Sequence, residues 1–181
     1  MNLSNFTIQA TEIVQSAQQS AYNAGNPTIE AEHMLQALLD QKNSPIEYLL
    51  KKNNVSLSLL SNKLKESLDR LPKTSSDPAQ SLSRDANSMF LKAGSLISKF
   101  KDEFVTPEHL LLAMVMGNDS SSRMLKEAGL TEKGLIQSIQ ELRKGETVKS
   151  QTQETQFNAL NKYAKNLIEM ARQGKIGRAH V

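Results

Sequence analysis

The sequence predicts an all-α fold: a tandem repeat of two four-helix units related by a pseudo-two-fold axis, followed by a linker and a C-terminal helix. Three observations lead to this prediction. The second half of the 181-residue chain repeats the pattern of the first half in constant register, and a match at a fixed period is typical of a repeated structural unit. Apolar residues recur at the i, i+4, i+7 spacing of one helix face. No segment alternates convincingly between apolar and polar residues, which disfavours β-strands.

The repeat is clearest in a short motif that occurs twice. Residues 29–37 read IEAEHMLQA and residues 105–113 read VTPEHLLLA, so both fit the pattern [IV]-x-x-E-H-[LM]-L-x-A. Further along the chain, one deletion in a loop shifts the register by a single position, so that Leu50 matches Leu125. We therefore expect one repeat domain over residues 1–143, in which repeat one spans residues 1–71 and repeat two spans residues 80–143.

The first helix of each unit is predicted from an apolar stripe that would face the core. In repeat one the stripe consists of Phe6, Ala10, Ile13, Val14, Ala17 and Ala21. In repeat two the matching residues are Leu82, Ala86, Met89, Phe90, Ala93 and Ile97.

The second helix of repeat two has a clear start signal in Thr106-Pro107-Glu108. Threonine caps helices, proline fits the first turn, and an acidic residue there interacts favourably with the helix dipole. Repeat one has Glu30 and Ala31 at the matching place, so that start is less well marked. A short third helix and a fourth helix complete each unit. Their apolar residues are Ile46, Tyr48, Leu49, Leu50, Leu57, Leu60, Leu64 and Leu68 in repeat one, and Met124, Leu125, Leu135, Ile136, Ile139 and Leu142 in repeat two.

Segments of a different character separate and follow the repeats. Residues 71–78 are rich in proline and serine and join the two units. A polar linker is predicted over residues 144–156. Apolar residues at a/d spacing predict an amphipathic helix over residues 157–175, leading toward a module absent from this chain. Residues 176–181 are expected to be a truncated end or a cloning remnant.

Composition narrows the function classes. The longest apolar run, residues 110–116, has seven residues, whereas a membrane-spanning helix needs about 20. The N-terminus lacks a secretory signal pattern, and the chain has no cysteine, which fits a reducing compartment. A cytoplasmic protein without a membrane partner is therefore expected. The net charge of +3 is spread along the sequence, so no nucleic-acid partner is expected either.

The sequence contains no signature of catalysis. It lacks a G-x-x-x-x-G-K-[ST] phosphate loop and the G-x-G-x-x-G and G-x-S-x-G motifs, so we expect no enzyme and assign no catalytic residue. Two Glu-His pairs, Glu32-His33 and Glu108-His109, lack the i, i+4 spacing of a helical zinc site. No metal or other cofactor is expected in this chain. We interpret His33 and His109 as structural groups that hold the preceding loop by hydrogen bonds.

Glu32 and Glu108 allow two interpretations. A carboxylate in the first turn of a helix is usually a solvent-exposed partner of the helix dipole, worth about 0.3 to 1 kcal/mol. Placed symmetrically, the two glutamates would instead form anionic pockets that bind a guanidinium group in bidentate fashion. The sequence alone favours the first interpretation.

The double E-H motif and the paired four-helix units resemble the N-terminal domain of the Clp/Hsp100 AAA+ unfoldases. Residues 143–148, 159–164 and 170–175 are similar to the segments that follow this domain in the ClpB disaggregase branch, which favours that branch over ClpA or ClpC. The resemblance covers residues 1 to about 175. It implies a substrate-binding domain of an ATP-dependent stress chaperone, recognising exposed hydrophobic segments of unfolded or aggregated proteins. The ATPase modules, which would bind ATP and Mg in the parent, are absent from this chain.

The resemblance also implies site residues and partners. In ClpB-type domains an apolar groove holds client segments, and the matching polar positions are Thr7, Asp102 and Glu108, with Phe104 as an apolar neighbour. In ClpC-type domains the glutamates that match Glu32 and Glu108 bind phosphorylated arginine. Docking of such clients, or of adaptors, for a protease is the alternative function. We expect the full-length parent to form a homohexamer that works with a DnaK-type chaperone system, and this chain alone to be monomeric.

Overall fold

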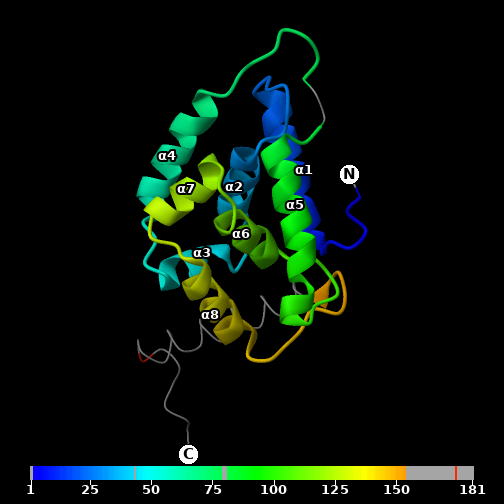
Figure 1. Cartoon of the computed structure of the whole chain (residues 1–181), viewed down its shortest axis with the longest axis vertical. Helices are drawn as coiled ribbons and strands as arrows, with labels where there is room; N and C mark the ends of the chain where they lie inside the picture. The colour runs from blue at the N-terminus through cyan, green and yellow to red at the C-terminus, as the bar shows by residue number, and fades with distance from the viewer. Residues whose placement is uncertain (1, 43, 79–80, 154–173, 175–181) are drawn as a thin grey trace, which may run out of the picture.

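The computed structural model describes residues 2–42, 44–78, 81–153 and 174, which form two sets of four α-helices in the same order (Figure 1). The predicted all-α fold and its tandem repeat are therefore confirmed. The helices of repeat one are α1 (Ile8–Asn23), α2 (Ala31–Asp40), α3 (Ile46–Lys52) and α4 (Leu57–Asp69). Those of repeat two are α5 (Arg84–Leu96), α6 (Pro107–Val115), α7 (Ser120–Glu127) and α8 (Glu132–Arg143), with a short 3₁₀ turn, η1 (Ser98–Phe100), after α5. The predicted helix over residues 157–175 falls almost entirely outside the described residues.

The helices pack with the pseudo-two-fold symmetry that the repeat predicts. Within each repeat the first two helices lie against each other, α1 on α2 and α5 on α6. Between the repeats, α1 contacts α6 as α5 contacts α2, and α3 contacts α8 as α7 contacts α4. The buried apolar residues of both repeats form one continuous core. No helix within the described ranges is long and apolar enough to cross a bilayer.

Two short backbone pairings connect the repeats reciprocally. The N–H of Thr7 donates to the carbonyl of Val105 over 2.9 Å, and the N–H of Val105 donates to the carbonyl of Asn5 over 2.8 Å. Equivalent hydrogen bonds of 2.9 and 3.0 Å occur at the symmetry-related residues Ile29, Ser81 and Ser83. The segment before the first helix of each repeat is therefore held by the loop before the second helix of the other.

These pairings correct the predicted start of the first helix in each repeat. Phe6 and Leu82 fit the apolar stripe by their spacing, but both lie before the helix, in the paired segments. The helices begin after Thr7 and Ser83, whose hydroxyls each accept a hydrogen bond from the backbone N–H three residues later. The side chains of Phe6 and Leu82 extend toward the core from extended backbone just before the cap residues. Apolar residues at helical spacing therefore do not by themselves identify the first residue of a helix.

Helix α6 lies at the centre of the core. All nine of its residues are buried, and it contacts helices of both repeats. Thr106 caps the helix and Pro107 occupies its first position, as the sequence indicates. In repeat one, Glu30 takes the cap position of α2.

The segment after α8 is not the free polar linker expected from the sequence. Val148 is buried, and its N–H donates to the Asp102 carboxylate over 2.7 Å. The carbonyl of Gln151 accepts a hydrogen bond from the N–H of Ile8 over 3.1 Å. Residues 144–153, called the strap below, are therefore part of the folded domain. The polar side chains of the strap did not predict its packing on the domain, because these two contacts use the backbone N–H of Val148 and the backbone carbonyl of Gln151.

We expect Leu112→Ala to lower the free energy of unfolding by about 2–5 kcal/mol, because it leaves a cavity in the fully buried α6. Urea denaturation followed by circular dichroism would measure the change. Leu91→Ala is the matched control: its side chain is 70% exposed, so a change within about 0.5 kcal/mol is expected. A similar small loss for both variants would contradict the central place of α6.

Candidate functional site

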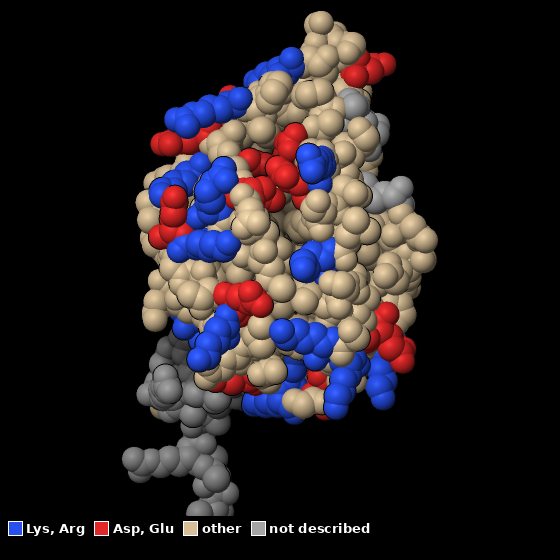
Figure 2. Space-filling view, in the orientation of Figure 1, with Lys and Arg blue, Asp and Glu red and all other residues tan. Residues whose placement is uncertain are grey.

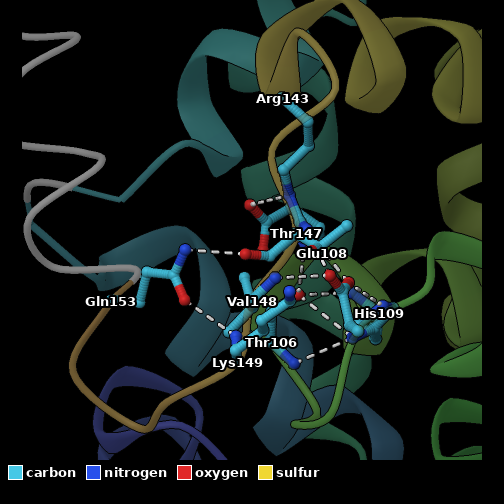
Figure 3. Close-up of polar contacts among 9 residues, drawn as sticks. Thr106, Glu108, His109, Arg143, Thr147, Val148, Lys149 and Gln153 are labelled. Atoms are coloured by element: carbon cyan, nitrogen blue, oxygen red, sulfur yellow. Dashed lines mark hydrogen bonds and ion pairs between the residues drawn. The ribbon is translucent and has the colours of Figure 1, made fainter.

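A buried polar cluster surrounds Asp102, in the loop before α6, and Figure 3 labels its partners Arg143, His109 and Val148. Arg143, the last residue of α8, donates from Nη1 to both carboxylate oxygens, over 2.8 and 3.0 Å. The N–H of Val148 donates to Oδ1 over 2.7 Å, and Nε2 of His109 lies 3.0 Å from Oδ2. Asp102 is 6% exposed, so its carboxylate is fully engaged inside the domain.

The cluster keeps Asp102 ionised. Burial alone would raise the pKa of this carboxyl group, because it disfavours the charged form. The hydrogen bonds from His109, Arg143 and the Val148 N–H outweigh burial and hold the pKa of Asp102 below its ordinary value. The ionised side chain thereby joins the loop before α6, the end of α8 and the strap.

Glu108 shares the guanidinium of Arg143. Its Oε1 lies 3.8 Å from Arg143 Nε, while Oε2 is buried without a hydrogen-bond partner among the described residues. The side chain is 1% exposed. In repeat two, therefore, the predicted anionic pocket for a guanidinium already holds one from the chain itself. In repeat one the position matching Arg143 is Leu68, so Glu32 has no such partner there.

Glu32 lies instead among other acidic side chains. The Ser67 hydroxyl donates to its Oε1 over 3.3 Å. Burial raises the pKa of Glu32, and the nearby carboxylates of Glu30 and Asp119 raise it further. In Figure 2, acidic side chains gather over α2, between α4 and α5.

The two histidines make equivalent contacts. In each repeat the histidine Nδ1 accepts a hydrogen bond of 2.9 Å from the backbone N–H of the helix cap residue. Nε2 of His33 lies 2.8 Å from Oδ1 of Asn26, and Asn26 matches Asp102, the partner of His109, when the repeats are aligned on their E-H motifs. In each histidine, Nδ1 thus holds the helix cap and Nε2 faces an oxygen atom inside the domain. No group of three His, Cys, Asp or Glu side chains suited to a metal ion occurs in the part of the chain described.

The predicted client-binding residues are buried. Thr7 is 0% exposed, Asp102 6% and Glu108 1%. The polar group of each is used inside the domain: Thr7 caps a helix, Asp102 anchors a loop, and Glu108 is an ion-pair partner. Phe104 is half-buried. The part of these four residues in client binding stays a prediction.

Sequence reasoning missed Arg143 and Val148. Aligning the repeats could have predicted the contact between Asp102 and His109. Asn26 aligns with Asp102, and both positions lie close to the E-H motif of their repeat. No local pattern marks Arg143, which lies 41 residues from Asp102 in the chain. Val148 contributes its backbone N–H, and the type of a residue does not predict what its backbone N–H binds.

An open groove of about 660 Å³ lies between the N-terminal segment and α5. Its lining residues are Asn2, Asn5, Phe6, Ser81, Leu82, Asn87, Phe90, Leu91 and Gly94. The rings of Phe6 and Phe90 pack with centroids 5.6 Å apart, and Leu91 is 70% exposed. None of the lining residues is charged, and Figure 2 shows few charged side chains on this side of the molecule, to the right of α5. Apolar side chains with amide groups beside them suit an extended polypeptide.

Comparison with known proteins gives consistent matches. Residues 5–128 match the Clp repeat (R) N-terminal domain family. The chaperone protein ClpB of Porphyromonas gingivalis is 36% identical over 97% of this chain and 20% of its own length. ClpB of Bacteroides thetaiotaomicron is 38% identical over the same shares. Among solved structures, the Hsp104 N-terminal domain from Candida albicans has a similar fold, with a TM-score of 0.69 at 24% identity over 82% of this chain and 97% of that one.

We expect Asp102→Asn to lower the free energy of unfolding by about 3–5 kcal/mol at pH 7, because Arg143 loses its buried partner. The pKa of Asp102 is lower in the folded state than its unfolded value of about 3.9. Its stabilisation is therefore present above that value and is lost as the pH falls through the folded pKa. Urea unfolding from pH 7 to pH 2 should show a smaller acid loss in Asp102→Asn than in the unchanged protein. Asp77→Asn, at an exposed position, should lose as much free energy of unfolding on acidification as the unchanged protein. An equal dependence of the free energy of unfolding on pH in all three proteins would contradict the stabilising role of ionised Asp102.

Glu32→Gln should keep or raise the free energy of unfolding at pH 7, because burial and nearby carboxylates disfavour the ionised form of Glu32. The raised pKa of Glu32 means that stability present below the unfolded value, about 4.3, is lost as the pH rises through the folded pKa. A neutral amide avoids that loss. Thermal unfolding at pH 7 would measure it, with the exposed Glu66→Gln as the control. A destabilisation above about 1 kcal/mol, relative to the control, would mean that the ionised form of Glu32 supports the fold.

Proposed function

This chain belongs to the Clp repeat N-terminal domain family, and from that basis we propose that it receives client polypeptides for an ATP-dependent protein disaggregase. The chain spans about a fifth of the length of its ClpB relatives. ATP and Mg binding therefore belong to the rest of the full-length protein. The domain itself binds clients and catalyses nothing.

The observation that carries the proposal is the uncharged groove beside α5. Leu91, which is 70% exposed, and the half-buried Phe90 offer apolar surface in the groove, which complements the apolar side chains that unfolded or aggregated proteins expose. Burial of such surface contributes about 25 cal/mol per Å². An unfolded client loses conformational entropy when it binds, so the affinity is weak, about micromolar or poorer.

Thr7, Asp102 and Glu108 act indirectly in this proposal. Pairing of the Thr7 backbone with the loop before α6 fixes the segment that places Phe6 in the groove wall. Asp102 and Glu108, through Arg143, hold that same loop. Phe104 belongs to the loop and, being half-buried, adds apolar surface for a client.

The wider assembly follows from the family relationship. We expect the full-length protein to form a homohexamer in the cytoplasm and to work with a DnaK-type chaperone system. This chain alone is expected to be a monomer, and its partners are polypeptides rather than nucleic acids or membranes.

Phosphoarginine binding is the second candidate function, and one observation favours it at one position. Glu32 lies beside the carboxylates of Glu30 and Asp119 and forms no ion pair with an arginine within the described residues, so a guanidinium would meet a group of acidic side chains there. Glu108 offers no equal support, because Arg143 already neutralises it. A loss of phosphoarginine binding in Glu32→Gln would favour this alternative.

Leu91→Asp should weaken binding of an unfolded client at least about tenfold, because a carboxylate in the groove must be desolvated when apolar side chains cover it. Residue-resolved NMR titration with a reduced, carboxymethylated globular protein would measure the affinity and locate the contact. Leu59→Asp is the matched control, since Leu59 is an exposed leucine of α4 outside the groove.

If Leu91→Asp and Leu59→Asp weakened client binding equally, the added negative charge alone would explain the change, and the groove would no longer be supported as the binding site. If the client instead shifted NMR signals around Glu32, and phosphoarginine competed with the client for binding there, the phosphoarginine alternative would be favoured.

A further inference from the structure

Repeat one contains a polar hollow formed by α1, α2 and α4. It consists of two adjoining cavities of about 410 and 480 Å³. Both cavities are lined by Ser20, Ala24, His33, Gln36 and Asp40. The first is also lined by the apolar residues Leu39, Leu64 and Leu68. No residue of this hollow lines the groove beside α5, so the two are separate features.

Backbone geometry identifies the matching place in repeat two. Gly25 and Lys101, which match when the repeats are aligned, both adopt left-handed backbone, with φ of 72° and 57°. In each repeat the next residue donates its N–H to the carbonyl five positions earlier over 3.0 Å. The residues that precede these turns, Ala24 and Phe100, are therefore structurally equivalent.

In repeat two, apolar side chains take the positions of several polar residues that line the hollow. The Phe100 ring packs beside His109 with ring centroids 5.5 Å apart. The counterparts of Ser20, Gln36 and Asp40 in repeat two are Leu96, Leu112 and Met116, and all three belong to the core or pack against it. In repeat one the methyl group of Ala24 replaces the phenyl ring, and polar groups line the space that remains.

We propose that the repeat-one hollow binds an aromatic side chain of a polypeptide, one that carries a hydrogen-bond donor as tyrosine and tryptophan do. The ring takes the place that Phe100 occupies in repeat two, beside His33 and against the apolar wall of the first cavity. Both nitrogens of His33 are already bonded within the domain, so this histidine contributes ring packing alone.

The donor requirement follows from the polar wall. Asp40 lines both cavities and makes no ion pair within the described residues, so its carboxylate is available to accept a hydrogen bond from a phenol or an indole. Ser20 donates to Gln36 over 3.1 Å, which fixes a second polar group beside it. A leucine or phenylalanine side chain offers no donor to the Asp40 carboxylate, so it lacks the hydrogen bond to a charged acceptor that a phenol or an indole makes.

The inference rests on the proposed function only in assigning the aromatic residue to a client, and the hollow is therefore tested with small amides. In NMR titration, N-acetyl-tyrosinamide should shift the signals of Ala24, His33 and Gln36 with a dissociation constant of about a millimolar. N-acetyl-leucinamide should bind at least about tenfold more weakly.

Ala24→Phe places the ring of repeat two in the hollow and should weaken amide binding at least tenfold, while Ala24→Ser should leave it unchanged. Gln36→Leu, which copies Leu112, is a second variant: it removes a polar group from the wall of the hollow and should also weaken binding. Leu91→Asp, in the groove, should have no effect on the amide.

Equal binding of the two amides, no shift around Ala24, or full binding by a folded Ala24→Phe protein would overturn the inference. If Ala24→Phe does not fold, full binding by Gln36→Leu overturns it in the same way. Amide binding in the hollow without any binding of unfolded client would reject the proposed function and leave the hollow as a site.

Discussion

The structure depends on the reciprocal pairing of each repeat's leading segment with a loop of the other repeat. Thr7 and Asn5 pair with Val105, and symmetry-related residues repeat the same hydrogen bonds at Ile29. Because each repeat supplies what the other needs, neither four-helix set buries its second helix alone. Helix α6 is enclosed on all sides only in the assembled pair. The groove beside α5 likewise exists only after assembly, since the N-terminal segment forms one of its walls.

From this shared backbone, the two repeats have acquired different polar interiors. Repeat two uses an ionised Asp102, and a buried charge is stable only when it is paired and hydrogen-bonded. Arg143 and the strap meet that requirement. Repeat one has the neutral Asn26, whose amide donates to a backbone carbonyl of the linker over 2.9 Å. It needs no arginine, and its interior remains open where repeat two is filled.

This divergence gives one domain two surfaces of different chemistry. The groove is uncharged and apolar, and suits side chains such as leucine or phenylalanine. The hollow combines an apolar wall with charged and amide groups, and suits an aromatic ring with a polar edge. A long unfolded chain contains both kinds of residue. Two weak contacts on one chain raise the overall affinity through effective concentration, while each contact alone is still released readily.

Apolar spacing and local cap chemistry are properties of neighbouring residues, so the sequence predicts the helices, their order, the tandem repeat and the cap at Thr106. The repeated motif also predicts that His33 and His109 lie at equivalent helix starts. Long-range packing, in contrast, sets Phe6 outside the helix, buries Asp102 and Glu108, and joins the strap to the domain. The partner that buries Asp102 comes from 41 residues away, and Val148 binds through its backbone. Periodicity identifies the apolar face of a helix, but the burial of a polar group depends on which distant segment packs over it.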